Sequence, residues 1–221
     1  MKGRSVALLI ILILIADQAL KFFIKTHYTL GEEHKMIGSW FRLHFVENEG
    51  MAWGLQFGGG VGKILLTLFR LVAVILGTFY LRTIIIKKYH TGFIICAALI
   101  YAGAFGNLID SMFYGLIFSS SNPFTVATLF PAGGGYATFF HGQVVDMLYF
   151  PIIHTHYPSW FPIKSWRGDE FEFFSPVFNL ADASISIGVI ALLIWQKKFF
   201  PHKHPHEKVE AREINDEVKV M

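Results

Sequence analysis

Charged residues are scarce in this sequence, and cysteine is almost absent. Only 16% of the 221 residues are Asp, Glu, Lys or Arg, whereas an ordinary soluble domain carries about 25%. Hydrophobic residues make up 53% of the chain, and the mean hydropathy is +0.47. A soluble enzyme would need a more charged surface, and a disordered protein would be far less apolar. The single Cys96 cannot form an internal disulfide, which excludes a disulfide scaffold.

Several motifs of metal, nucleotide and nucleophilic chemistry are also missing. The ten histidines include His154 and His156, but no H-E-x-x-H occurs and one cysteine cannot build a structural zinc site. The glycines at 58–60 lack the Lys-Ser/Thr ending of a P-loop, and no G-x-S-x-G marks a serine nucleophile. We therefore expect no metal and no cofactor. Because the basic residues form no cluster, we expect no nucleic-acid partner either.

Four apolar segments are long enough to cross a bilayer, which takes roughly 20 residues. They cover residues 5–24, 62–86, 92–114 and 175–195. The first contains the unbroken apolar run 5–16, which could be the core of a signal peptide. No small-x-small cleavage site follows that run, and Asp17 and Lys21 follow it instead. The sequence therefore predicts an α-helical integral membrane protein. It has four transmembrane helices in a single domain, 1–200, and a polar cytoplasmic tail, 201–221.

The flanking basic residues predict the orientation of these helices. Lys21 and Arg70 fall inside apolar segments and are left out of this comparison. Eleven basic residues flank one side: Lys2, Arg4, Arg82, Lys87, Lys88, Lys197, Lys198, Lys203, Lys208, Arg212 and Lys219. Six lie in the longer loops of the other side: Lys25, Lys35, Arg42, Lys63, Lys164 and Arg167. Both termini are therefore expected in the cytoplasm.

Two longer regions, 25–61 and 115–174, are then expected on the outer side. The alternating stretch 41–48 predicts a strand. The second region begins as a Ser- and Gly-rich loop and ends in an aromatic stretch that includes Trp160 and Trp166. The predicted strand indicates a small extracytoplasmic β-sheet. Because Trp and Tyr favour the membrane interface, we expect the aromatic stretch to form an interfacial arm.

Four aspartates lie at or near membrane level, where a charge usually has a function or a partner. Asp17 is four residues before Lys21, so the two either form a structural ion pair or face a substrate. Asp110, three residues after Asn107, is expected to join helices by hydrogen bonds, since Gly103 and Gly106 allow close helix approach.

Asp146 and Asp182 lie at the same, outer ends of their segments. Asp146 stands in the apolar context VVDMLYF, where it is either a helix cap or a reactive group. Asp182 follows Asn179 by three residues and either joins helices or reacts. Two carboxyls within hydrogen-bonding reach share a proton, so that one can activate water while the other donates to a carbonyl. This pair therefore predicts aspartic-protease chemistry, if the fold brings the two residues together.

Five segments, in order, resemble the lipoprotein signal peptidases (signal peptidase II), the bacterial membrane aspartyl proteases. They are DQALK (17–21), NEGMAWG (48–54), GNLID (106–110), GQVVDML (142–148) and FNLADASISIG (178–188). The resemblance implies removal of signal peptides from prolipoproteins, by cleavage before a diacylglyceryl-modified cysteine. It also implies a monomer in the bacterial inner membrane, in contact with membrane lipid, with an outward-facing site sensitive to cyclic peptides of the globomycin type.

The resemblance also implies roles for particular residues. Asp146 and Asp182 correspond to the catalytic aspartates. The substrate-binding residues would be Asp17, Lys21, Asn48, Gly50, Asn107 and Asn179, and the structural support would come from Asp110 and Ala181.

The chain departs from the family pattern in two places. Ser111 stands where most members have an arginine, whose task Arg42 or Lys21 could take over. The interval between Asp110 and Asp146 is long, and the extra loop could gate the site, bind a partner or be filler.

Two other functions remain open from the sequence. A small transporter or proton-coupled carrier would use intramembrane Asp and Asn to bind an ion or solute near the membrane midplane. A structural membrane chaperone would use the same side chains only to join helices. The transporter is the main alternative to the peptidase.

Overall fold

The computed structural model describes residues 1–49, 59–173 and 176–200, and the predicted polar tail lies outside them. Within the described residues, four helices are long and apolar enough to cross a membrane. They are α1 (Gly3–His27), α2 (Gly59–Ile86), α3 (Thr91–Ile109) and α5 (Leu180–Phe199). Their exposed side chains are largely apolar, as lipid contact requires. The prediction of a multi-pass helical membrane protein is confirmed.

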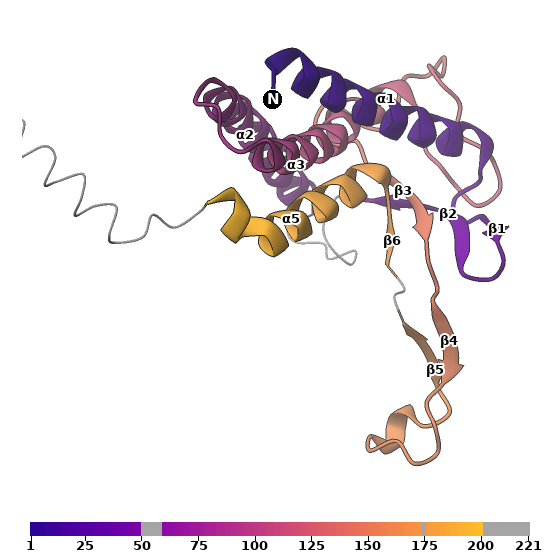
Figure 1. The fold of residues 1–221 in the computed structure, drawn as a ribbon. Helices are drawn as coiled ribbons and strands as arrows, with labels where there is room; N and C mark the ends of the chain where they lie inside the picture. Colours follow the sequence, from indigo (N-terminus) through magenta and orange to yellow (C-terminus); the bar gives the residue numbers. More distant parts are fainter. Residues whose placement is uncertain (50–58, 174–175, 201–221) are drawn as a thin grey trace, which may run out of the picture.

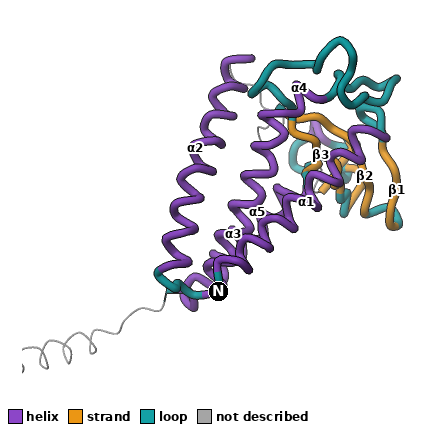
Figure 2. The backbone as a smooth tube through the Cα atoms, turned by 90° about the horizontal axis from the view of Figure 1, so that it is seen from above, coloured by secondary structure: helices purple, strands orange, loops and turns teal. Residues whose placement is uncertain are grey.

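Helix α3 is the central helix and packs against α1, α2 and α5, most extensively against α5 (Figure 2). The close approach depends on small residues, because a Cβ at Gly103 would overlap the backbone carbonyl of Ala181 on α5. The helical path continues through a π-helical turn, η2 (Asp110–Tyr114), into the short α4 (Gly115–Ile117). The predicted end at residue 114 is therefore three residues early.

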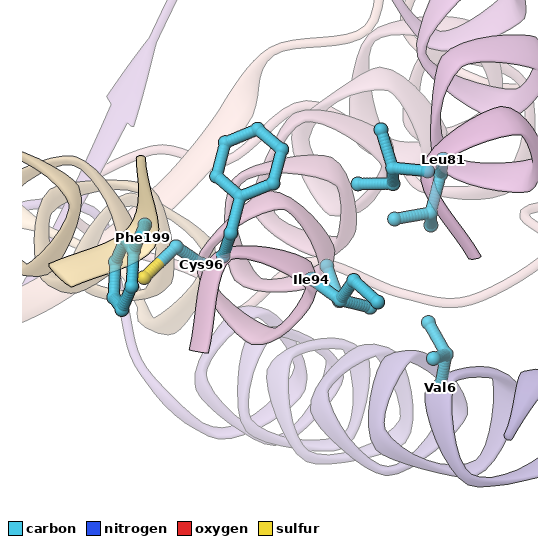
Figure 3. Close-up of a cluster of buried hydrophobic side chains, with 8 residues drawn as sticks. Val6, Leu81, Ile94, Cys96 and Phe199 are labelled. Atoms are coloured by element: carbon cyan, nitrogen blue, oxygen red, sulfur yellow. The ribbon is translucent and has the colours of Figure 1, made fainter. Parts of the chain in front are cut away.

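A buried apolar cluster joins the helices at the end where the N-terminus lies (Figure 3). It includes Val6 of α1, Leu81 of α2, Ile94 and Cys96 of α3, and Phe199 of α5. Cys96 is a free thiol inside this cluster. Packing of this kind holds the helices together by van der Waals contact, since lipid tails are as apolar as the side chains themselves.

An antiparallel sheet lies at the opposite end of the helices, which we call the sheet end (Figures 1 and 2). Its strand order is β1-β2-β3-β6, with bounds β1 (Glu33–Ile37), β2 (Phe41–Asn48), β3 (Val144–Tyr149) and β6 (Val177–Phe178). The strand predicted at 41–48 is confirmed as β2. Phe45, Val145 and Met147 of the sheet pack against Tyr114 and Phe118 and form a second apolar core.

The fourth helix begins five residues later than predicted. The segment expected at 175–195 is Leu180–Phe199, because Val177 and Phe178 pair with Tyr149 and Leu148 as strand β6. Asn179 then caps the helix, since its Oδ1 accepts a hydrogen bond from the backbone N–H of Asp182 at 2.9 Å. Hydropathy alone does not reveal this strand, because its residues are as apolar as those of the helix.

A hairpin projects from the sheet as a long arm (Figure 1). It consists of β4 (Ile153–His156) and β5 (Glu170–Phe173), with a tip that contains the short 3-10 helix η3 (Lys164–Trp166). Trp160 at the tip is 76% exposed. The predicted aromatic arm is therefore present, and its contact with the outer leaflet stays a prediction.

Candidate active site

Asp146 is buried on β3, with 3% of its surface exposed. Its Oδ2 accepts a hydrogen bond from Asn48 Nδ2 at 3.2 Å, and its Oδ1 accepts one from Asn179 Nδ2 at 2.7 Å. Asn48 ends β2, beside β3 in the sheet. The alternative that Asp146 caps a helix is wrong, because the residue lies in the middle of a strand. Both of these contacts come from neutral amides, so neither cancels the charge of the carboxylate.

Asp182 lies in the first turn of α5 and is partly exposed. Its Oδ1 accepts a hydrogen bond from Asn107 Nδ2 at 2.7 Å. The amino-terminal end of a helix carries partial positive charge, which attracts a carboxylate there. Asp182 therefore differs from the buried Asp146 in both its position and its exposure.

Asn179 connects the surroundings of the two aspartates. Its Nδ2 donates to Asp146 Oδ1 and also to Asn107 Oδ1, at 3.1 Å, while its Oδ1 caps Asp182. Burial, together with the negative charge of Asp182, raises the pKa of Asp146 to about 7. The fold thus brings two carboxyls, which are 36 positions apart in the sequence, close enough for the charge of one to influence the other. The surroundings of the two carboxyls differ. We call Asp146 and Asp182 the dyad.

A second cluster of charges lies next to the dyad and is fully buried. Lys21 Nζ is 2.9 Å from Asp17 Oδ2 and 2.7 Å from Asp110 Oδ2, and it donates to Asn107 Oδ1 at 2.9 Å. Gln18 Nε2 donates to Asp110 Oδ1 at 2.8 Å. The predicted pairing of Asp17 with Lys21 is confirmed, as is the role of Asp110 in joining helices. We call Asp17, Lys21 and Asp110 the ion cluster.

The ion cluster also fixes the start of α5. Asp17 Oδ1 accepts a hydrogen bond from the backbone N–H of Ala181 at 2.9 Å. A Cβ at Gly106 would lie 2.8 Å from Asp17 Oδ2 and 3.2 Å from the Ala181 methyl, so only glycine fits between α1, α3 and α5 here. The ion cluster therefore positions the residue directly before Asp182.

The remaining predicted site residues are placed as follows. Asn48, Asn107 and Asn179 all contact the dyad, although their contact with a substrate stays a prediction. Asp17 and Lys21 are enclosed in the ion cluster, and substrate contact by them likewise stays a prediction. Gly50 lies outside the described residues. Across the described ranges, no three His, Cys, Asp or Glu side chains are placed to hold a metal ion.

The residues suggested to replace the missing arginine at position 111 have other partners. Arg42 Nη1 is 2.8 Å from Glu33 on the surface of the sheet, and Lys21 belongs to the ion cluster. The guanidinium at Ser111 comes instead from Arg70 of α2, whose Nη1 donates to Ser111 Oγ at 3.0 Å. Arg70 was left out of the comparison of flanking charges because it lies within an apolar segment. That position was itself the signal, since a charge at membrane depth usually has a function.

The comparisons with known proteins decide the family. A sequence model described as Signal peptidase (SPase) II matches residues 9–198. The chain is 51% identical over 194 residues to a lipoprotein signal peptidase of Porphyromonas gingivalis, covering 87% of this chain and 83% of that one. The chain belongs to the signal peptidase II family. This family consists of membrane proteases that cleave signal peptides from lipoproteins, as the motifs had indicated.

Further signal peptidase II relatives agree over nearly the whole length. A lipoprotein signal peptidase of Amoebophilus asiaticus is 35% identical over 218 residues, covering 97% of this chain and 85% of the relative. A solved bacterial membrane enzyme shares the fold with a TM-score of 0.55 at 24% identity, covering 90% of this chain and 96% of that one. The match in fold supports the four-helix arrangement with its small sheet.

Proposed function

We propose that this protein is an aspartyl endopeptidase that removes the signal peptide from diacylglyceryl-modified prolipoproteins, cutting before the lipidated cysteine. The observation that carries the proposal is the dyad. Asp146 and Asp182 lie within electrostatic reach of each other, and the surroundings of the two carboxyls differ in burial, hydrogen bonding and exposure.

The unequal surroundings assign a role to each carboxyl. Asp146 is buried among amides and, with a pKa of about 7, retains the shared proton near neutral pH. It donates this proton to the scissile carbonyl oxygen. Asp182, partly exposed at a helix amino-terminus, is the carboxylate that takes a proton from the attacking water. The water oxygen adds to the carbonyl carbon and gives a tetrahedral intermediate with two hydroxyls. Asp182 then passes its new proton to the leaving amine as the C–N bond breaks, and one hydroxyl returns its proton to Asp146 as the carbonyl of the new carboxyl group forms.

The position of the dyad suits a substrate that is itself a membrane helix. The dyad lies at the sheet end of the helices, with Asp146 on a strand and Asp182 at the first turn of α5. A signal peptide could lie beside the helices while its cleavage site reaches the sheet end. The basic flanks of the segments favour an inner-membrane orientation with this end outside and both termini in the cytoplasm.

The main alternative, a transporter, calls for a site near the membrane midplane that is open to both sides. The described part of α3 and α5 is instead closely packed below the dyad, where Gly103 and Gly188 bring the helices together. The site position therefore favours the peptidase.

A cleavage assay tests the proposal. Purified full-length protein in detergent, given a diacylglyceryl-modified prolipoprotein, should release a signal peptide and a mature protein that begins at the modified cysteine, as measured by mass spectrometry. Asp146→Asn and Asp182→Asn should each lower kcat/KM by roughly 10²- to 10⁴-fold, the contribution of general acid or base catalysis. Asp169→Asn, on the exposed arm, is the matched control and should leave cleavage unchanged.

Two results would contradict the proposal. One is an unchanged kcat/KM in either dyad variant. The other is equal cleavage of a substrate that lacks the diacylglyceryl group, which would refute the stated substrate class while leaving the chemistry intact.

A further inference from the structure

Helix α2 presents a short polar stripe to the site. Lys63, Thr67 and Arg70 follow each other at spacings of four and three residues, which places them on one face of the helix. Lys63 Nζ donates to the carbonyl oxygen of Glu49 at 2.6 Å, directly after Asn48 of the site. Thr67 Oγ1 donates to the carbonyl oxygen of Phe140 at 3.1 Å. The stripe therefore faces the chain segments that surround the dyad, and Arg70 is the member that contacts Ser111.

The Ser111 hydroxyl holds Arg70, and a second hydrogen bond fixes the orientation of that hydroxyl. Ser111 is fully buried, and its Oγ donates its proton to the carbonyl oxygen of Asn107 at 3.0 Å. The lone pairs of the same oxygen are then available to Arg70 Nη1 at 3.0 Å. Asn107 in turn donates its side-chain amide to Asp182. Three hydrogen bonds thus link the guanidinium of α2 to the dyad through α3, where Asn107 accepts with its backbone carbonyl and donates with its side-chain amide.

The charged groups around Arg70 also connect it to the dyad. The carboxylates that attract it are Asp182, then Asp110, then Asp146. Asp110 is already paired with Lys21 in the ion cluster. Both aspartates of the dyad are therefore within reach of the positive charge of Arg70, and their direct contacts are neutral amides.

We propose that Arg70 is the positioning cation of this active site, held by Ser111 beside the dyad, where it stabilises the negative charge that the two aspartates share. The proposal rests on the proposed function of the dyad. It gives Ser111 a role as well, because a small hydroxyl there admits a guanidinium from the neighbouring helix. Arg70 supplies from α2 the charge that the family pattern places at position 111.

A pH profile separates this role from a structural one. Removal of the charge in Arg70→Gln should raise the pKa of Asp146. The part of the pH profile in which kcat/KM falls as pH rises, which we call the falling limb, should therefore move to higher pH. We expect kcat/KM at the optimum to fall by about tenfold or more. Arg70→Lys keeps the charge and should keep the position of the limb. Arg82→Gln, an exposed arginine on the same helix, is the control that should behave as the unaltered protein.

An exchange of positions gives a second, independent test. Ser111→Arg alone would bring two guanidiniums together and should lower activity. The double variant Arg70→Ser with Ser111→Arg restores a single guanidinium from α3 and should be more active than either single variant. A double variant no better than the worse single one would contradict the proposal.

The results distinguish this proposal from the function on which it rests. If the dyad variants abolish cleavage while Arg70→Gln, corrected for folded protein, leaves both the rate and the limb unchanged, only the role of Arg70 is refuted. If the dyad variants retain cleavage, the proposed function itself fails.

Discussion

Two groups of aspartates lie side by side at the sheet end of the helices, yet their surroundings differ. In the ion cluster, Asp17 and Asp110 share the ammonium group of Lys21, which is completely buried with them. In the dyad, Asp146 and Asp182 are contacted mainly by the amides of Asn48, Asn107 and Asn179. Asn107 touches both groups, since it accepts from Lys21 and donates to Asp182.

The difference shows what separates a structural aspartate from a reactive one. A buried carboxylate beside a cation is neutralised as a pair and holds helices together. A buried carboxylate whose direct contacts are amides keeps its hydrogen bonds without forming an ion pair, so it retains its proton at higher pH. The dyad has the second kind of surroundings, which leaves it able to exchange protons.

The largest effect on stability should come from the centre of the ion cluster. Lys21→Met leaves two buried carboxylates without their cation, and the loss of one partner from a buried ion pair costs about 3–5 kcal/mol. We expect the thermal unfolding temperature in detergent to fall sharply. The triple variant Lys21→Met, Asp17→Asn, Asp110→Asn carries no charge in the ion cluster and should recover much of the loss. An equally unstable triple variant would show that shape, and not charge, holds the cluster together.

A smaller loss of stability should follow when a methyl group is added between α3 and α5 at Gly103. A Cβ in Gly103→Ala would meet the carbonyl of Ala181, which is a backbone atom and cannot move aside alone. We expect a loss of about 1–3 kcal/mol in the free energy of unfolding, together with slower cleavage, because Asp182 follows Ala181. Gly133→Ala is the control, since nothing lies within 4 Å of its Cβ position. Equal stability of the two variants would argue against tight packing at Gly103.

The smallest effects that test the contrast between the ion cluster and the dyad are changes of cleavage and stability with pH. The pKa of Asp146 is raised from 3.8 to about 7 in the folded protein, so cleavage should decline as pH rises through about 7 and the shared proton is lost. Between about pH 4 and 7 the folded state binds more protons than the unfolded state, so the free energy of unfolding should fall as pH rises.

Asn48 lowers the pKa of Asp146 by its hydrogen bond. The variant Asn48→Ala should therefore move the falling limb to higher pH, by roughly half a unit to one unit. A limb that moved to lower pH in kcat/KM measurements would contradict this assignment.

The sequence was sufficient to predict the helices, because long apolar runs indicate membrane spans directly. The start of α5 was predicted too early, because Val177 and Phe178 are apolar but pair with β3. The π-helical turn at Asp110–Tyr114 could not be predicted either, since it depends on contacts with the loop, such as the hydrogen bond from Gly142 N–H to the carbonyl oxygen of Ser111 at 2.9 Å.

The site was predictable where residues repeat the family motifs and unpredictable where tertiary structure decides. Asp17 and Lys21 could be paired from their spacing on one helix. No spacing reveals that Arg70, 41 positions from Ser111, reaches its hydroxyl, because that contact depends on how α2 packs on α3. The contrast between the two aspartate groups likewise needs the fold, since all four residues look alike as isolated charges in apolar segments.

The most direct test of the account compares one aspartate from each group. Asp146→Asn and Asp110→Asn remove the same charge, and kcat/KM per folded molecule and the thermal unfolding temperature would be measured for both. We expect Asp146→Asn to lower kcat/KM by roughly 10²- to 10⁴-fold and to keep the unfolding temperature. Asp110→Asn should lower the unfolding temperature while the protein that remains folded still cleaves. Cleavage by folded Asp146→Asn protein would contradict the account.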